Sequence, residues 1–385
     1  MKAVRSVMLV GAALALAACS DQSPTAANGR QAVAPVRLAQ SGGIDGSYVV
    51  VLNDGANPRS VAAVAGVNPH FVYTAVVNGF SAELNQGQLN ALQHNPSVAY
   101  IEQDQTYSVA TTQSGATWGI DRIDQRNRPL SGTYTYTTTA SNVTAYIIDT
   151  GIQASHPQFG GRASAVYDAL GGTGADCNGH GTHVAGTIGS STYGVAKGVR
   201  LRAVRVLDCN GSGATSGIIS ALDWVRVNAA KPAVANMSLG GGLSSTLNTA
   251  ATNLANSGVF LAVAAGNENQ NACNVSPASA SGTLTVAAST STDAKASYSN
   301  WGSCVDVYAP GSSITSTWLN SGTNTISGTS MASPHAAGVG ALYKGTFGDA
   351  ASSTVVSWII NNSTANVITG NVTGTPNRLL YKSTL

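Results

Sequence analysis

The chain has 385 residues, which is enough for one large core or for two or three domains. Only 9% of the residues are charged and the formal net charge is +2, whereas 43% are apolar, so a compact core of small side chains is expected. This charge content excludes a dense basic patch, and with it the classes of protein that bind nucleic acids or membrane surfaces.

Residues 1–19 have the pattern of an export signal, because Lys2 and Arg5 are followed by an apolar run that ends in small residues. The run is too short to span a membrane. Ala15–Ala17 suits ordinary signal cleavage, whereas Leu16–Cys19 resembles a bacterial lipobox in which Cys19 is lipidated. Both interpretations predict export.

Residues 20–43 are rich in Ala, Gln, Ser and Pro without periodicity, which is typical of a linker. A compact unit is predicted next, with strands at 47–54 and 97–104, helices at 57–66 and 85–95, and a hairpin at 70–84 that turns near Asn78–Gly79. Asn85 and Gln88 are close to capping-box spacing. The order βαββαβ predicts a small α+β, ferredoxin-like domain over 44–110, for which we expect a folding or docking role.

Beyond Trp118 the pattern changes, because helical stretches now alternate with apolar runs at 143–149, 201–208, 234–239, 259–267 and 283–288. Continuous apolar strands separated by helices predict a mostly parallel sheet with helices on both faces, which is a three-layer α/β fold. Ligands bind such sheets beyond the carboxyl ends of the strands. Polar residues at those ends are therefore the candidates for function.

Asp149 and a pair of histidines are the first such candidates. Asp149 ends a buried strand, where a carboxylate is costly unless it is hydrogen-bonded, so it is either a turn residue or an acid that orients a histidine. His180 and His183 lie three residues apart at a predicted helix start. A zinc-binding pair would be four apart with an intervening Glu. The spacing instead favours one histidine as a base and the other as a packing residue.

Ser330 precedes an apolar stretch that is predicted to be a helix. Pro334 is tolerated only in the first turn, which places Ser330 at the helix N-terminus. Exposed N–H groups there favour an oxyanion beside the hydroxyl, although a serine is also an ordinary N-cap residue. The chain order Asp149, His180, Ser330 is that of subtilisin, whereas an α/β-hydrolase elbow would need glycine in place of Ala332.

Three segments, YIIDTGI, GHGTHVAGT and GTSMASPHAAG, resemble the active-site segments of the subtilisin-like serine peptidases, most closely the proteinase K branch and aqualysin within it. Further segments, such as WGIDRIDQR and AVRVLDCNGSG, extend the resemblance over about 111–385, and 46–105 resembles the inhibitory prodomain of these enzymes. The resemblance implies a subtilisin-like peptidase domain at 111–385 behind a prodomain at 44–110. It also implies a secreted serine endopeptidase that works through an acyl-enzyme and is made as a self-processed zymogen.

By the same resemblance, Asp149, His180 and Ser330 form the catalytic triad, and His183 is a packing residue. Asn267 belongs to the oxyanion hole by this resemblance, whereas its own segment would indicate only a turn residue. The implied cleft walls are small and uncharged, which favours broad specificity with a preference for apolar or aromatic residues. We expect protein and peptide substrates, the prodomain as intramolecular inhibitor, a monomer and no nucleic acid. The implied wall residues are Gly211, Ser212, Gly213, Ser238, Leu239, Gly240, Gly241, Ala264, Ala265 and Gly266.

Four cysteines follow the export segment, and by themselves they permit three pairings; no C-x-x-C spacing suggests a metal. The aqualysin-like pattern implies the disulfides Cys177–Cys209 and Cys273–Cys304. It also implies structural calcium and no catalytic metal.

The first calcium site implied by the resemblance consists of Asp306 with the backbone carbonyls of Ser281 and Thr283. A second would use Asp121, Asp124 and Gln125, although Ser131 replaces an acidic residue there. Self-cleavage near Ala110 would leave any lipid on Cys19 with the prosegment. Two other interpretations remain open: an inactive relative that only binds peptides, and a metal-dependent hydrolase that uses His180 and His183.

Overall fold

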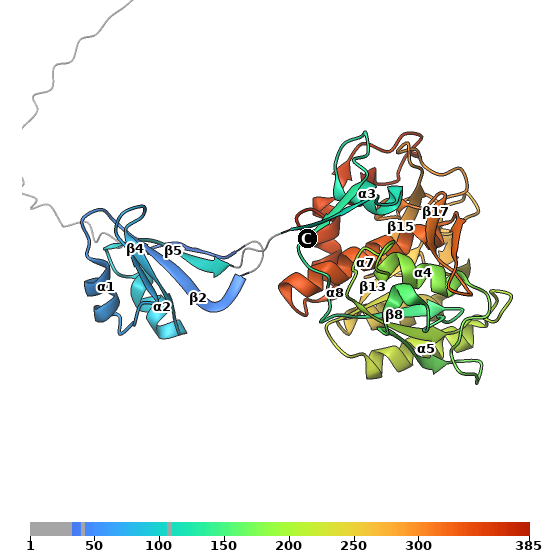
Figure 1. Cartoon of the computed structure of the whole chain (residues 1–385), viewed down its shortest axis with the longest axis horizontal. Helices are drawn as coiled ribbons and strands as arrows, with labels where there is room; N and C mark the ends of the chain where they lie inside the picture. Colours follow the sequence, from blue (N-terminus) through green and yellow to red (C-terminus); the bar gives the residue numbers. More distant parts are fainter. Residues whose placement is uncertain (1–32, 40–42, 106–109) are drawn as a thin grey trace, which may run out of the picture. The chain divides into compact units, whose positions relative to one another are not determined.

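The computed structural model describes residues 33–39, 43–105 and 110–385; the predicted signal, Cys19 and much of the predicted linker lie outside these residues. Contacts divide the chain into two compact units, with the boundary between Asp104 and Gln105 (Figure 1). Among the residues described, no helix is long and apolar enough to cross a membrane.

The first unit is a five-stranded sheet with two helices, in the strand order β1-β5-β2-β4-β3. Its core is apolar: Val50, Phe80 and Ile101 from the strands are fully buried together with Leu92 from a helix. The elements in chain order are β1 (Val36–Arg37), β2 (Gly43–Leu52), α1 (Pro58–Val64), β3 (Phe71–Tyr73), β4 (Gly79–Glu83), α2 (Gln86–Gln93) and β5 (Val98–Gln105).

The predicted linker at 20–43 is wrong at its C-terminal end, because Val36–Arg37 form β1, which pairs in parallel with β5. Two residues are too short a strand to show a period, and stacking of Arg37 on the Tyr100 ring helps to hold them. The hairpin also differs slightly: Asn78 directly precedes β4, and its side chain donates to the backbone carbonyls of Asn53 and Ala56 in the loop between β2 and α1. The capping box of Asn85 and Gln88 is present.

The second unit contains a nine-stranded sheet in the order β19-β20-β16-β15-β13-β11-β8-β10-β9. All its neighbours are parallel except the edge pair β19–β20, as the continuous apolar runs predict. The strands are β8 (Thr144–Asp149), β9 (Ala163–Asp168), β10 (Arg200–Arg205), β11 (Ala233–Met237), β13 (Phe260–Ala264), β15 (Leu284–Ser289), β16 (Val307–Pro310), β19 (Thr364–Ala365) and β20 (Arg378–Leu379).

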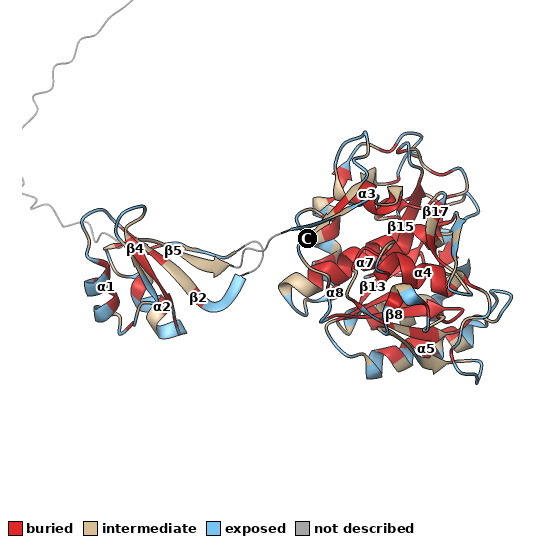
Figure 2. Cartoon of the chain, viewed as in Figure 1, coloured by how far each residue is buried: buried red, intermediate tan, exposed pale blue. Residues whose placement is uncertain are grey.

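Helices cover both faces of this sheet, and the central strands are largely buried (Figure 2). Neighbouring residues of a central strand therefore enter different cores. Ile147 packs with residues of α4 and α7, whereas Ile148 packs with residues of α5 and α6. The helices are α3 (Trp118–Asp124), α4 (His180–Gly189), α5 (Thr215–Asn228), α6 (Ser245–Asn256), α7 (Thr329–Phe347) and α8 (Ser352–Asn362). Three two-stranded sheets complete the unit: β6 (Thr111–Ser114) with β7 (Thr133–Tyr136), β12 (Gly241–Gly242) with β14 (Val275–Ser276), and β17 (Ile314–Thr317) with β18 (Thr323–Ile326).

The order of the central strands decides which polar residues meet. Strands β8, β11 and β13 are adjacent and parallel, so their carboxyl ends lie at one edge of the sheet. Asp149 is the last residue of β8, Ser238 follows β11, and Asn267 comes shortly after β13. Residues that are far apart in the sequence are thereby brought together.

Candidate active site

The buried Asp149 is hydrogen-bonded to the partly exposed His180. Asp149 is fully buried, and its Oδ1 accepts from His180 Nδ1 at 2.8 Å and from the Thr150 N–H at 2.7 Å. Burial by itself lowers the pKa of His180, but the charge and hydrogen bond of Asp149 and the charge of Asp176 outweigh it, so the pKa is raised from 6.5. About 25% of the His180 side chain remains exposed. The imidazole is therefore oriented on one side and accessible on the other.

The start of α4 explains how His180 reaches this position. Gly179 precedes the helix with φ 105°, a left-handed conformation that favours glycine. A Cβ at Gly179 would also lie only 2.4 Å from the ring of Trp318. The chain therefore turns sharply into α4, and His180 is its first residue.

His183 has a different environment. It is fully buried, its Nε2 lies 3.0 Å from the Ile314 carbonyl oxygen, and burial lowers its pKa to about 4. The two imidazoles of the HGTH segment thus have different partners. In the described part of the chain, no group of three or more His, Cys, Asp or Glu side chains is placed to hold a metal.

Ser330 lies in the first turn of α7, two residues after Gly328. Its Oγ donates to the Ser238 carbonyl oxygen at 3.1 Å, and the Ser238 hydroxyl donates to the Ser330 carbonyl oxygen at 2.7 Å. This reciprocal pair fastens the start of α7 to the carboxyl end of β11, the strand next to β8. Ser330 is only partly buried, so its hydroxyl can be reached from solvent.

Among the described residues, Asn267 is held through its side-chain oxygen. Its Oδ1 accepts from the Thr329 N–H at 2.8 Å and from the Thr329 hydroxyl at 2.9 Å. The side chain is exposed, so the amide group on the other side is presented to solvent. Thr329, which the sequence patterns do not single out, is therefore the residue that orients Asn267.

Two cavities adjoin these residues. One of about 550 Å³ is lined by His180, by Gly211–Gly213 and by Ser238–Gly241. The other, of about 270 Å³, is lined by Gly240–Gly242 and by Ala264 and Gly266.

Two details of the second cavity differ from the wall predicted from the sequence. Ala265 is fully buried and packs in the core with Tyr308, since it points away from the neighbours that line the cavity. Glu268 does line the cavity, and its Oε2 accepts from Asn300 Nδ2 at 2.9 Å. The wall therefore combines small residues with polar ones, Gln270, Asn274 and Ser276, and with one carboxylate, which the sequence patterns missed.

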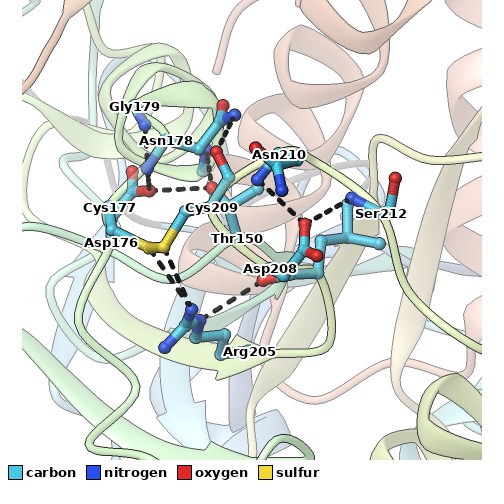
Figure 3. The surroundings of a disulfide bond; sticks show 12 residues. Thr150, Asp176, Cys177, Asn178, Gly179, Arg205, Asp208, Cys209, Asn210 and Ser212 are labelled. Carbon is cyan, nitrogen blue, oxygen red and sulfur yellow. Dashed lines mark hydrogen bonds between the residues drawn. A yellow bond between two sulfur atoms is a disulfide. The ribbon is translucent and has the colours of Figure 1, made fainter.

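Both disulfides implied by the resemblance are present in the structure. Cys177–Cys209 and Cys273–Cys304 have S–S distances of 2.01 Å and 2.11 Å. The first joins the loop before His180 to the loop after β10 that lines the larger cavity (Figure 3).

The second predicted calcium site does not fit a cation. Asp121 accepts from Ser131 N and Oγ on one oxygen and from Gly132 N on the other. Asp124 accepts from Thr135 N and forms an ion pair with Lys382 at 3.0 Å. Donors already occupy these carboxylates. Hydrogen bonds of the Gln125 side chain to backbone carbonyls complete the same network.

The residues of the first predicted calcium site are oxygen donors. Asp306 Oδ2 accepts from the Thr285 N–H at 2.8 Å, and the buried Thr283 lies two residues before Thr285 in the chain. The Ser281 carbonyl accepts from Thr252 Oγ1 at 2.8 Å. A carboxylate and two carbonyls are the hard oxygen donors that Ca²⁺ prefers.

Comparison with known proteins identifies the family. The model of the subtilase family matches residues 140–379, and the peptidase inhibitor I9 model matches residues 65–110. The chain belongs to the subtilase family. This confirms the predicted serine endopeptidase, its subtilisin-like α/β fold and its inhibitor-type propeptide.

Individual subtilase relatives match over most of their length. The extracellular serine proteinase of Thermus sp. (strain Rt41A) is 49% identical over 96% of each chain. Proteinase R of Parengyodontium album is 43% identical over 92% of this chain and 93% of the relative. A solved structure, described as the crystal structure of a cold adapted subtilisin-like serine proteinase, is 52% identical with a TM-score of 0.69 and covers 70% of this chain and 99% of that one.

Proposed function

We propose that this subtilase is secreted and hydrolyses peptide bonds through Asp149, His180 and Ser330. The observation that carries the proposal is the 2.8 Å bond between the buried Asp149 carboxylate and His180 Nδ1. Ser330 supports it, because its hydroxyl is bonded to Ser238, which lines the same cavity as His180. An imidazole that is anchored at Nδ1 presents Nε2 as a base. A serine at a helix N-terminus offers a hydroxyl next to backbone N–H groups.

In the proposed reaction, the Ser330 hydroxyl gives up its hydrogen bond to the Ser238 carbonyl. It then donates its proton to His180 Nε2 as Oγ attacks the substrate carbonyl. His180 then protonates the leaving amine, and water hydrolyses the resulting ester on Ser330 by the same route. Asp149 keeps the imidazole in the required tautomer and stabilises its charged form.

The oxyanion that forms during attack needs donors that are already in place. Asn267 supplies its amide group, because Thr329 holds the opposite oxygen of that side chain. The N–H of Ser330 at the start of α7 supplies a second donor. Removing one such donor typically costs about 3 to 4 kcal/mol of transition-state stabilisation.

An extended peptide would lie between Ser238–Gly241 and Gly211–Gly213, both of which line the larger cavity. The residue before the scissile bond would enter the smaller cavity beside Ala264 and Gly266. The small residues Gly240–Gly242, Ala264 and Gly266 leave room there for apolar or aromatic side chains, with the Glu268 carboxylate as the charged group of the wall.

The N-terminal part is proposed to be a signal at 1–19, a linker that ends before β1, and an inhibitory prodomain up to about residue 110. Self-cleavage near Ala110 would free the peptidase domain, 111–385, as a monomer that acts on proteins and peptides and has no nucleic-acid partner. A lipid on Cys19, if attached, would stay with the prosegment.

Calcium is proposed as a structural ion at Asp306, with the carbonyls of Ser281 and Thr283. When bound, the ion would neutralise the carboxylate and tie the start of β15 to the start of β16. Removing it with a chelator is expected to lower the unfolding temperature while leaving turnover of the still-folded enzyme unchanged. Immediate loss of turnover at low temperature would contradict a structural role.

The decisive experiment for the proposed function compares the wild type with Ser330→Ala. The wild type is expected to mature and to hydrolyse a peptide anilide, whereas the variant accumulates as unprocessed precursor and does neither. Equal processing of both chains would refute self-cleavage by Ser330.

A further inference from the structure

A second carboxylate, Asp176, lies just before the helix that carries His180. Its Oδ1 accepts from Thr150 Oγ1, Asn178 N and Gly179 N, each at 2.9 Å. Its Oδ2 accepts from the N–H of Thr182 at 2.9 Å and from the Thr182 hydroxyl at 2.6 Å. Figure 3 shows Asp176 with the donors Thr150, Asn178 and Gly179. Since Thr182 follows His180 in the chain, the donors come from both sides of that histidine.

The same network reaches Asp149. Thr150 directly follows Asp149 and donates its N–H to the Asp149 carboxylate. The Thr150 hydroxyl donates to Asp176 and accepts from the Gly181 N–H at 2.9 Å. A single side chain thus connects the end of β8 with the first turn of α4, the two segments that must hold Asp149 and His180 in register.

A third connection leads to the wall of the cleft. Asn178 Oδ1 accepts from the His180 N–H at 3.2 Å, and Asn178 Nδ2 donates to the Cys209 carbonyl oxygen at 2.9 Å. The Cys177–Cys209 disulfide bridges the same two loops. Asp176 therefore anchors a turn that also positions the loop beside the substrate cavity.

We propose that Asp176 is a positioning residue of the peptidase site, whose carboxylate fixes the backbone around His180 so that the imidazole meets both Asp149 and Ser330. The inference rests on the proposed roles of those three residues. It adds to them a second acid that touches no substrate and acts through His180.

The negative charge of Asp176 gives this role a signature that ordinary structural support lacks. The groups that act on the His180 charge are Asp149 at the end of β8, His183 one turn along α4, and Asp176. Burial has the largest effect on the pKa of His180 and lowers it. Asp149 raises this pKa, and the charge of Asp176 raises it further. Removing the Asp176 charge should therefore lower the pH at which His180 becomes protonated.

The test measures the rate at which a phosphonofluoridate labels Ser330 between pH 5 and pH 9. Wild type, Asp176→Asn and the control Asp168→Asn are expressed as full chains and, where needed, matured in trans by immobilised wild-type enzyme. Asp168 is the control because its carboxylate, like that of Asp176, accepts hydrogen bonds from backbone N–H groups. Unlike Asp176, it lies at the end of β9 and pairs with Arg205.

Asp176→Asn is expected to lower the plateau rate roughly 10- to 100-fold, because small displacements of a reacting group cost that much. It should also move the acidic midpoint down by about half a pH unit or more, the effect of one lost charge nearby. Asp168→Asn should change neither value. Unfolded protein only lowers the amount labelled and leaves the midpoint unchanged.

Thr150→Val provides a second variant should Asp176→Asn yield too little folded protein. It keeps the Asp176 charge but removes the hydroxyl link to β8, so the plateau rate should fall while the midpoint stays. An unchanged midpoint in Asp176→Asn, or a wild-type plateau in Thr150→Val, would overturn the inference. His180→Ala distinguishes failure of the Asp176 inference from failure of the proposed function. Labelling at the wild-type rate in that variant would refute the proposed function itself.

Discussion

Acid sensitivity of the peptidase unit can be worked out from two buried histidines. His335 in α7 and His183 in α4 are almost completely buried, and burial lowers the pKa of each to about 4, against an ordinary value of 6.5. Both stay neutral in the fold at pH 5, whereas in the unfolded chain they bind a proton. The free energy of unfolding therefore falls as the pH drops below 6.5.

The magnitude follows from the size of the shift. Between pH 6.5 and pH 4.5, one histidine with a folded pKa of about 4 destabilises the fold by about 2 kcal/mol. The test compares unfolding at these two pH values in a Ser330→Ala chain and in the same chain with His335→Asn. The asparagine can still donate to the Met331 carbonyl, which lies 2.8 Å from His335 Nδ1. Because carboxylates titrate alike in both chains, their contribution cancels.

Tryptophan fluorescence isolates the relevant transition, since all five tryptophans lie at or beyond Trp118. The chain without His335 is expected to lose about 2 kcal/mol less stability between the two pH values. His70→Asn, which changes an exposed histidine of the first unit, should leave the loss unaltered. Equal losses with and without His335 would show that this histidine is not held neutral, and would refute the reasoning.

Three further predictions concern activity and stability. Asp149 and Asp176 outweigh burial and raise the pKa of His180. On the acidic side of a pH profile, kcat/KM should therefore be half-maximal at a pH above 6.5, and a midpoint below pH 6 would contradict this. Lys382→Met should lower the free energy of unfolding by about 3 to 5 kcal/mol, measured with denaturant, because it leaves the Asp124 carboxylate without its cation. Adding Asp124→Asn should restore part of this free energy, and no recovery in the double variant would argue against the ion pair. Replacing both Cys273 and Cys304 by serine should lower the free energy of unfolding by about 3.5 kcal/mol with little effect on turnover, and an unchanged melting temperature would contradict that value.

The sequence predicts the sheet and the residues proposed as the triad because each lies beside a strong local signal. Asp149 ends an apolar run, His180 follows Asn178–Gly179 at a predicted helix start, and Ser330 begins an apolar helical stretch, although Pro334 lies in the second turn of α7 and not in the first as predicted. These signals depend on neighbours in the chain, so they can be read without a structure.

The rest of the site depends on contacts between distant residues and leaves no local pattern. Asp176 matters because hydroxyl and N–H donors from residues 150 to 182 converge on it. Asp124 resembles a calcium ligand in its own segment, but the fold brings Lys382 against it. Ala265 follows the wall residue Ala264 just after β13 ends, yet it packs in the core with Tyr308.

The most direct test of the central claim is a crystal structure of the matured enzyme with a peptidyl phosphonate bound. Three outcomes are expected together: a covalent bond from the phosphorus to Ser330 Oγ, His180 Nε2 within about 3 Å of that oxygen, and the Asn267 amide donating to the phosphoryl oxygen. An adduct on another residue, or an imidazole of His180 well beyond hydrogen-bond distance of Ser330, would contradict the account.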